Sequence, residues 1–319
     1  MKLLDFDELP KSYDPGRAIV SLAAFGEVRH RRTIDLWRRR AHRLADYGGV
    51  FAVDHGMVVG QAFVERIPYT FSHGTETVSG IAGVTTRLDH ARAGIMRRVL
   101  KEIHRREREA GIRHSILWTN RSWGAHRLYE ELGYRDVYAP PFAARILPSR
   151  RRRPTGTKVR AARQSDLREI ERLHARSGEG RWGFAQRPDG FARLAAATGE
   201  FRVEDVLVAL DRGRPFGYAV YKSDRNRTGC GELVASSASG RALLTAALEA
   251  RARSGLVAFW AGVVDDLGPE LRRRGYVVAS AGWFGLMATE FGRERSRAEL
   301  VREFGTHDPR FRCFAGDHF

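Results

Sequence analysis

The sequence predicts an α/β (α+β) protein of two domains, each a mixed, mostly antiparallel, twisted sheet flanked by helices. Three observations lead to this prediction. The chain has 319 residues, more than a single hydrophobic core usually organises. A stretch rich in proline and arginine, LPSRRRRPTGTK at 147–158, interrupts every apolar pattern. The segments on either side of it repeat one order of elements at an offset of about 150 residues, which is typical of a duplicated unit.

The first copy begins with a helical pattern at 30–47 and a hairpin at 50–65, VFAVDHGMVVGQAFVE, whose strands flank a D-x-G turn. A third strand is expected at 78–85. An amphipathic helix, a strand at 114–119 and a short helix that ends in Gly133-Tyr134 follow it. Antiparallel hairpins followed by crossover helices predict a mixed sheet.

The second copy repeats this plan from a helical pattern at 166–174. Its hairpin is VLVALDRGRPFGYAVY at 206–221, and its last helix ends in Gly275-Tyr276. The predicted organisation is a catalytic domain at 1–147, a basic linker at 148–157 and a second domain at 158–319.

The composition restricts the kinds of function that the protein can have. Lys and Arg number 55 against 38 Asp and Glu, a net charge of +17, which attracts polyanions; a GC-rich genome would give the same arginine surplus without a function. Cys230 and Cys313 form no C-x-x-C pair, so neither a disulfide framework nor a zinc cluster is expected. The N-terminus MKLLDFDELPK has no long apolar run. We therefore expect a cytoplasmic protein without membrane contact.

The segment from Gly83 to Tyr134 carries the clearest chemical signal. GIAGVTT at 80–86 is strand-like and passes through an arginine-rich loop into the helix after Gly94. A loop that enters a helix N-terminus leaves backbone N–H groups unpaired at the positive end of the helix dipole, so it can hold a phosphate. The segment then continues through the strand HSILWT into AHRLYEELGY.

This succession resembles the GNAT acetyltransferase superfamily. In that family a strand, a Q/R-x-x-G-x-G/A pyrophosphate loop, a helix, a strand and an A-x-x-L-Y-E-x-L-G-F/Y ending follow in this order. The ending AHRLYEELGY matches closely, and Gly94 takes the place of the first loop glycine. Ala91 stands where Gln or Arg is usual, and Met96 where the second small residue is usual.

The resemblance implies two tandem GNAT-like domains, the second degenerate, and an N-acetyltransferase with acetyl-CoA as co-substrate and no metal. Tyr129 would protonate the departing CoA thiolate, and Val84 and Thr85 would offer amides to the pantetheine arm and the thioester oxygen. The residues implied to bind the cofactor are Val84, Thr85, Thr86, Arg92, Ala93, Gly94, Ile95, Met96 and Asn120.

The base that takes a proton from the acceptor amine stays open among three carboxylates. Glu76 begins the strand that leads to Gly83, Glu65 lies on the hairpin, and the chain ends in Phe319. A C-terminal carboxylate lies near the catalytic tyrosine in tandem-GNAT aminoglycoside acetyltransferases of the enhanced-intracellular-survival type, which motivates the third choice. In the second copy Leu271 stands where the first has Tyr129, so we expect that copy to be a scaffold.

Two other functions remain open. The charge and the arginine runs at 38–40, 150–153 and 272–274 would suit a nucleic-acid- or ribosome-associated protein. Ala91 and Met96 would suit a pseudoenzyme that binds CoA without transferring an acyl group. The expected partner is otherwise a small-molecule or peptide amine. Metal catalysis is not expected, because the histidines near this segment lack metal-ligand spacing.

Overall fold

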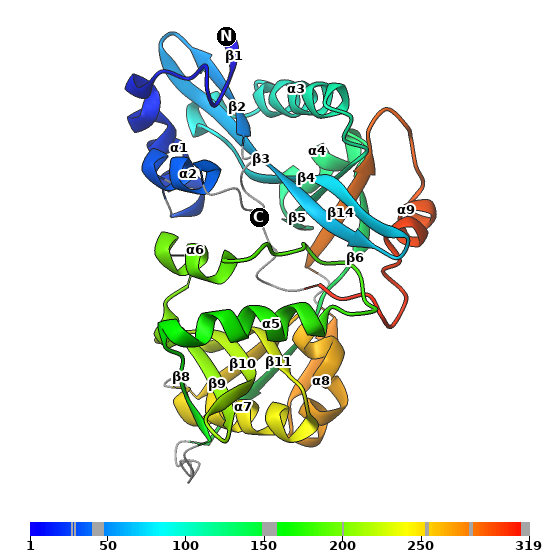
Figure 1. Cartoon of the computed structure of the whole chain (residues 1–319). Coiled ribbons are helices and arrows are strands. Elements are labelled where there is room, and N and C mark those ends of the chain that lie inside the picture. Colours follow the sequence, from blue (N-terminus) through cyan, green and yellow to red (C-terminus); the bar gives the residue numbers. More distant parts are fainter. Residues whose placement is uncertain are drawn as a thin grey trace. The chain divides into compact units, whose positions relative to one another are not determined.

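The computed structural model describes residues 1–26, 28, 30–39, 48–148, 158–199, 201–252, 255–280 and 283–313 (Figure 1). The chain divides into two compact units. The first comprises Met1–Tyr138 and Trp283–Thr306, and the described part of the second comprises 139–280 and 307–313. Each unit contains one mixed sheet of seven strands with helices packed on it. The predicted fold class is confirmed.

The first unit is built on a sheet in which only β4 and β5 run parallel. Its strand order is β1 (Lys2–Asp5), β2 (Gly48–Asp54), β3 (Met57–Phe71), β4 (Gly74–Thr86), β5 (His114–Asn120), β14 (Phe284–Glu290) and β6 (Arg135–Tyr138). Its helices are α1 (Asp14–Phe25), α2 (Arg31–Arg39), α3 (Ile95–Glu109), α4 (Gly124–Glu131) and α9 (Arg297–Phe304).

The two faces of β3 show how this sheet is covered. Gly60, Ala62 and Val64 face the buried side of α3, and the core there also contains Tyr129. Gln61 lies on the opposite face, where its side chain donates to Ser21 of α1. Helices α3 and α4 therefore cover one face of the sheet, and α1 covers the other (Figure 1).

The second unit repeats this architecture. Its strand order is β13 (Val277–Ser280), β7 (Pro141–Ile146), β12 (Leu256–Trp260), β11 (Thr228–Ala235), β10 (Arg214–Ser223), β9 (Val206–Asp211) and β8 (Val159–Ala161). Helices α7 (Ala238–Arg251) and α8 (Gly262–Arg273) cover one face, and α5 (Leu167–Ser177) and α6 (Phe191–Thr198) cover the other (Figure 1).

The first hairpin of each unit has the same turn. Two residues connect β2 to β3 and β9 to β10, and both residues of each turn have positive φ: 43° and 76° at His55-Gly56, 46° and 81° at Arg212-Gly213. A two-residue turn with two positive φ angles matches the twist of antiparallel strands. The repeat seen in the sequence is therefore a repeat of local geometry.

The units differ from the predicted domain boundaries by an exchange of strands. β7 lies before the predicted boundary at residue 147, yet it pairs between β12 and β13 of the second sheet. β14 lies in the C-terminal half of the chain, yet it pairs between β5 and β6 of the first sheet. The pairing of β7 with the second sheet places the boundary between the units after Tyr138. The sequence pattern did not show this, because periodicity identifies a strand but not its partners. Most of the predicted basic linker, 149–157, lies outside the described residues.

No helix in the described ranges is long and apolar enough to cross a membrane.

Candidate active site

The first unit has an opening in its sheet between β4 and β5. Their parallel pairing runs from Val78 opposite His114 to Ile81 opposite Leu117, and no paired positions follow. On its other edge β4 carries one extra residue, because Gln61 pairs with Thr85 whereas Phe63 pairs with Ala82. Such a bulge bends a strand and increases its twist. β4 therefore diverges from β5 beyond Ile81.

Gly83 lies in this bulge and depends on being glycine. Its φ of +58° is left-handed, and a Cβ added there would lie 2.5 Å from the Phe63 ring. The bulge leaves the pairing of Thr85 and Thr86 with β3 intact. At these two residues one backbone edge of β4 is paired with β3, and the other edge faces the opening. This is the arrangement expected of a strand that would pair with an extended ligand.

A cavity of about 280 Å³ lies at this opening. It takes residues from both faces of the sheet, since Tyr129 belongs to the core under α3 whereas Ser21 and Phe25 belong to α1. Its described lining consists of Ser21, Phe25, Phe63, Ile81, Ala82, Gly83, Val84, Trp118, Thr119, Trp123, Ala125 and Tyr129. The cavity thus brings the predicted Val84 and Tyr129 together.

Tyr129 is 5% exposed and borders this cavity. Its ring packs edge-on against Tyr134 with 6.0 Å between centroids. The Tyr134 hydroxyl is held by Ser115 at 2.8 Å and by His104 at 3.1 Å, so the ring beneath Tyr129 is fixed. Burial raises the pKa of Tyr129 above its usual value near 10. The phenol is therefore protonated at neutral pH and can donate a proton.

The loop before α3 has the geometry of an anion cradle. Arg92 and Gly94 have φ of +63° and +73°, and Gly94 is the N-cap residue of the helix. Among the described residues no side chain caps this end, so the first-turn amides from Ile95 onward point outward. Ala93 and Gly94 are exposed. The positive end of the helix dipole adds to the field of the neighbouring arginines.

Met96 does not block this cradle. Its terminal methyl group packs over Gly60 of β3, where a Cβ would approach it to 2.6 Å. The methionine therefore fills the space between α3 and the sheet, and only its backbone faces the loop. The departure from a small residue at this position is accommodated by a glycine on the facing strand.

Asn120 ends β5 and starts the turn into α4. Its side-chain oxygen accepts hydrogen bonds from the Ser122 amide and hydroxyl at 2.9 and 2.7 Å. That side chain is thus occupied in shaping the chain toward Trp123 and the N-terminus of α4. Its predicted contact with the cofactor, through the backbone, stays a prediction.

Glu76 lies at the opposite end of β4, and it does not line the cavity. Its carboxylate accepts from His73 at 2.8 Å and lies 3.4 Å from His114 and 3.9 Å from Arg113. Gly83 lies seven positions further along the strand, a distance of about 23 Å in extended backbone. The structure therefore separates this predicted base from Tyr129. Phe319, the C-terminal candidate, lies outside the described residues.

Replacing Glu76 with Gln should leave acetyl-CoA turnover within about twofold of the parent, because about 17 Å of strand separates it from Ile81, the cavity-lining residue of β4 that comes first along the chain. The ion pair with Arg113 would be lost, so a lower melting temperature is expected. Initial rates of thiol release, measured beside a melting curve, check both. A tenfold loss of rate without a change in melting would restore Glu76 as a base.

Glu65 lies closer to the cavity. It is 2% exposed on β3 and shares a face with Phe63, one cross-strand pair away from the cavity-lining pair Phe63–Ala82. Its own cross-strand partner, Gly80, has no side chain to cover it. This buried carboxylate lies on the face of the sheet that α1 covers, close to the cavity but not among the residues that line it.

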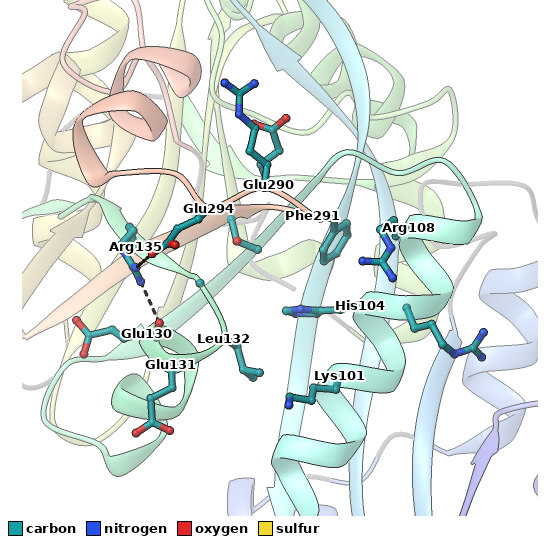
Figure 2. Close-up of a pocket in the computed structure, with 15 residues that line it drawn as sticks. Lys101, His104, Arg108, Glu130, Glu131, Leu132, Arg135, Glu290, Phe291 and Glu294 are labelled. Carbon is teal, nitrogen blue, oxygen red and sulfur yellow. Dashed lines mark hydrogen bonds and ion pairs between the residues drawn. The ribbon is translucent and has the colours of Figure 1, made fainter.

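Figure 2 shows a larger hollow, about 680 Å³, along the C-terminal half of α3. Lys101, His104 and Arg108 of α3 face Leu132 and Phe291 across it. Burial, and to a lesser degree Arg108, lowers the pKa of His104 to about 4, so this ring is neutral. The lining contains neither the loop before α3 nor Tyr129. This hollow is therefore not the candidate active site.

The corresponding loop of the second unit is closed. The Ser237 hydroxyl accepts from the Gly240 amide at 3.2 Å and so caps α7, and a Cβ on Gly240 would meet Phe216 at 2.6 Å. At the start of α8 the Gly262 amide donates to the Cys313 carbonyl at 2.9 Å. At each of these two helix N-termini the chain itself thus bonds one of the first amides.

The position of the acid is also lost in the second unit. Leu271, which stands in the place of Tyr129, is fully buried in the core under α7 and α8. Where β11 leaves β12, beyond Cys230 opposite Phe259, the buried Glu232 bonds to Arg187 and His174. In the second copy, predicted from the sequence to be degenerate, a leucine thus takes the place of the tyrosine, and a buried ion pair lies where the strands diverge.

Residues 18–137 match the family model of the acetyltransferase (GNAT) domain. Similar solved structures include a GCN5-related N-acetyltransferase from Anabaena variabilis (TM-score 0.66, 14% identity, 90% of this chain and 72% of that one). Eis1 from Mycobacterium abscessus is another (TM-score 0.58, 16% identity, 92% and 74%). A third is a tandem GNAT protein from the clavulanic acid biosynthesis pathway (TM-score 0.56, 12% identity, 92% and 100%).

The chain has a tandem GNAT fold. The matched residues contain the whole opening between β4 and β5 with Tyr129, which supports N-acetyltransferase activity in the first GNAT unit. Comparison with the sequences of curated proteins gave no match. Within the described ranges, no cluster of three or more His, Cys, Asp or Glu could hold a metal ion.

Proposed function

We propose that the first GNAT unit transfers the acetyl group of acetyl-CoA to a primary amine by direct attack. The observation that carries this proposal is the juxtaposition of a bulged, diverging strand, a helix N-terminus with outward amides, and a buried protonated tyrosine at one opening. Pyrophosphate would bind the amides from Arg92 to Met96, and pantetheine would pair with β4 from Val84 to Thr86 and with the backbone at Asn120.

In this reaction the amine nitrogen attacks the thioester carbonyl carbon, a C–N bond forms, and the C–S bond breaks. A backbone amide at Val84 would stabilise the oxygen that becomes negative. Tyr129 would give its proton to the thiolate, and the proton shed by the new amide would return to solvent or to Glu65 through water. Glu65 is favoured over Glu76 because it lies two positions from the cavity-lining Phe63 on the same strand.

Acetyl-CoA should protect the protein against thermal unfolding, and Gly94→Val should weaken that protection at least tenfold in apparent affinity. A β-branched residue resists the left-handed backbone that Gly94 adopts, so the loop amides would lose their alignment. The affinity is measured from the rise in melting temperature with acetyl-CoA concentration.

Gly111→Val is the matched control, because Gly111 follows the other end of α3, has φ of +78°, and has equally open space around it. Both variants should lose stability alike, whereas only Gly94→Val should lose acetyl-CoA affinity. Equal affinity in the two variants would overturn the proposed cradle.

The same measurement distinguishes the two alternatives. A CoA-binding pseudoenzyme would be protected by acetyl-CoA but would release no thiol with any amine. A nucleic-acid-binding protein would show salt-dependent affinity for RNA without acetyl-CoA protection. Along α3 the arginines are partly neutralised, since Arg105 pairs with Glu102 and Glu109.

A further inference from the structure

The cavity at the opening is walled by aromatic rings. Phe25 comes from α1, Phe63 from β3, Trp118 from β5, and Trp123 from the residue before α4. The polar side-chain groups of the lining residues are hydroxyls and the indole N–H groups of the two tryptophans, and the Ser21 hydroxyl already accepts from Gln61. Among the described residues that line it, none carries a charge. This lining restricts which amines can enter.

Two of the four rings are fixed before any ligand binds. Phe63 is 3% exposed and packs edge-on against Phe51, with 5.8 Å between centroids. Trp118 stacks on Phe284 at 5.4 Å with an interplanar angle of 13°. Rigid rings bind a flat apolar group without loss of side-chain entropy.

The other two rings are exposed. Phe25 is 46% and Trp123 57% exposed, which leaves large apolar surface in water at the cavity. An apolar body bound between them would bury that surface and gain hydrophobic free energy in proportion to its area.

We infer that the acceptor is a monoamine with one flat aromatic or branched apolar body, joined to the amino group directly or through a short alkyl chain. This inference rests on the proposed N-acetyltransferase function and adds its substrate class. The cavity has a volume of about 280 Å³, and the thioester end of acetyl-CoA would occupy the part of it at Val84 and Tyr129, so the acceptor must be small. Polycations such as polyamines and aminoglycosides are disfavoured, because their additional ammonium groups would lose water without gaining a carboxylate. The net charge of +17 also repels them.

An apolar cavity also helps the chemistry. Only a neutral amine can attack a thioester, and transfer from water to apolar surroundings favours the neutral form of an amine. The single ammonium group can face the Glu65 side of the opening and lose its proton there. The aromatic walls therefore both select the amine and prepare it to react.

The test compares phenethylamine with spermidine and kanamycin in acetyl-CoA thiol release. We expect at least a tenfold higher kcat/KM for phenethylamine. Phe25→Ala and Trp123→Ala should each lower that value about fivefold or more through KM, since each removes one wall from an exposed position. The matched controls are Leu22→Ala on the same helix and Trp283→Ala, which are 55% and 48% exposed and do not line the cavity. Both should stay within twofold.

A binding measurement separates this inference from the proposed function. N,N-dimethylphenethylamine cannot form a stable amide, so its affinity, measured by calorimetry with CoA present, reports the cavity alone. Binding that weakens in Phe25→Ala and Trp123→Ala supports the inference even if no amine releases thiol, a result that would refute the proposed activity. Preferred acetylation of spermidine or kanamycin would overturn the inference but would leave the proposed N-acetyltransferase activity standing. Failure of the aromatic amine to bind would also overturn the inference.

Discussion

Replacing Tyr129 with Phe should lower kcat for acetyl transfer by about 10²-fold, the lower end of what a positioned general acid contributes. That factor corresponds to about 2.7 kcal/mol of transition-state stabilisation. Phenylalanine keeps the edge-on contact with Tyr134 but removes the only proton donor that Tyr129 offers to the cavity. The affinity for acetyl-CoA should therefore stay within about threefold, so that kcat falls and KM does not. Steady-state thiol release gives both quantities.

Tyr134→Phe is the matched control for this variant. Its hydroxyl bonds to Ser115 and His104 but does not line the cavity. Removing it leaves buried partners unsatisfied, which should cost about 1–3 kcal/mol of stability and change kcat only severalfold. If both variants lose kcat equally, Tyr129 has a structural role and the assigned acid role is refuted.

The pH dependence of kcat tests the same assignment. Burial raises the pKa of Tyr129 above its usual value, so the phenol stays protonated, and able to donate, through the alkaline range in which ordinary tyrosines begin to ionise. The parent enzyme should therefore show no loss of kcat as pH rises from about 8 to about 10. A fall of kcat with an apparent pKa below 9 would mean that another group is the acid.

The sequence predicted the parts of this site that share one local pattern. Gly94 and Tyr129 lie in segments whose helical periodicity and ending are continuous along the chain, so their positions followed from the order of elements. The bulge at Gly83 has no such signal, because it arises from the pairing of β4 with β3. Glu76 was assigned to the site because it lies on the right strand. Only the register shows that it lies at the end of that strand away from Gly83.

The walls of the cavity could not be predicted for a related reason. Phe25, Phe63, Trp118 and Trp123 come from four elements and share no spacing, so each by itself indicated only core or surface. The exchange of β7 and β14 between the sheets was equally hidden, since an apolar strand pattern carries no record of its partner. Such features depend on which elements pair and pack in the folded chain, and no single segment of the sequence indicates them.

Replacing Arg187 with Ala should destabilise the second unit by about 3–5 kcal/mol, the cost of leaving one charge of a buried pair without its partner. Glu232 is 4% exposed by side chain and accepts from Arg187 at 2.8 and 3.1 Å. His174 lies 3.2 Å from the same carboxylate, and Tyr218 also donates to it. Denaturant unfolding measures the loss. Arg202→Ala, which breaks the exposed pair with Glu204, is the control and should cost no more than about 1 kcal/mol.

The pH dependence of that loss shows whether the charge of Glu232 is responsible. Burial by itself would raise the pKa of Glu232, but Arg187 and His174 outweigh it and lower the pKa below the reference value of 4.5. A carboxylate whose folded-state pKa is lowered contributes stability that is complete above the unfolded-state pKa and is lost as pH falls through the folded-state value. The difference between the parent and Arg187→Ala should therefore be full at neutral pH and shrink below about pH 4.5. A difference independent of pH would mean that Arg187 acts by packing. The Arg187–Glu232 pair lies where β11 leaves β12, the position that corresponds to the opening between β4 and β5 in the first unit. The loss of stability in Arg187→Ala therefore measures how much this pair contributes to keeping that position of the second GNAT copy occupied.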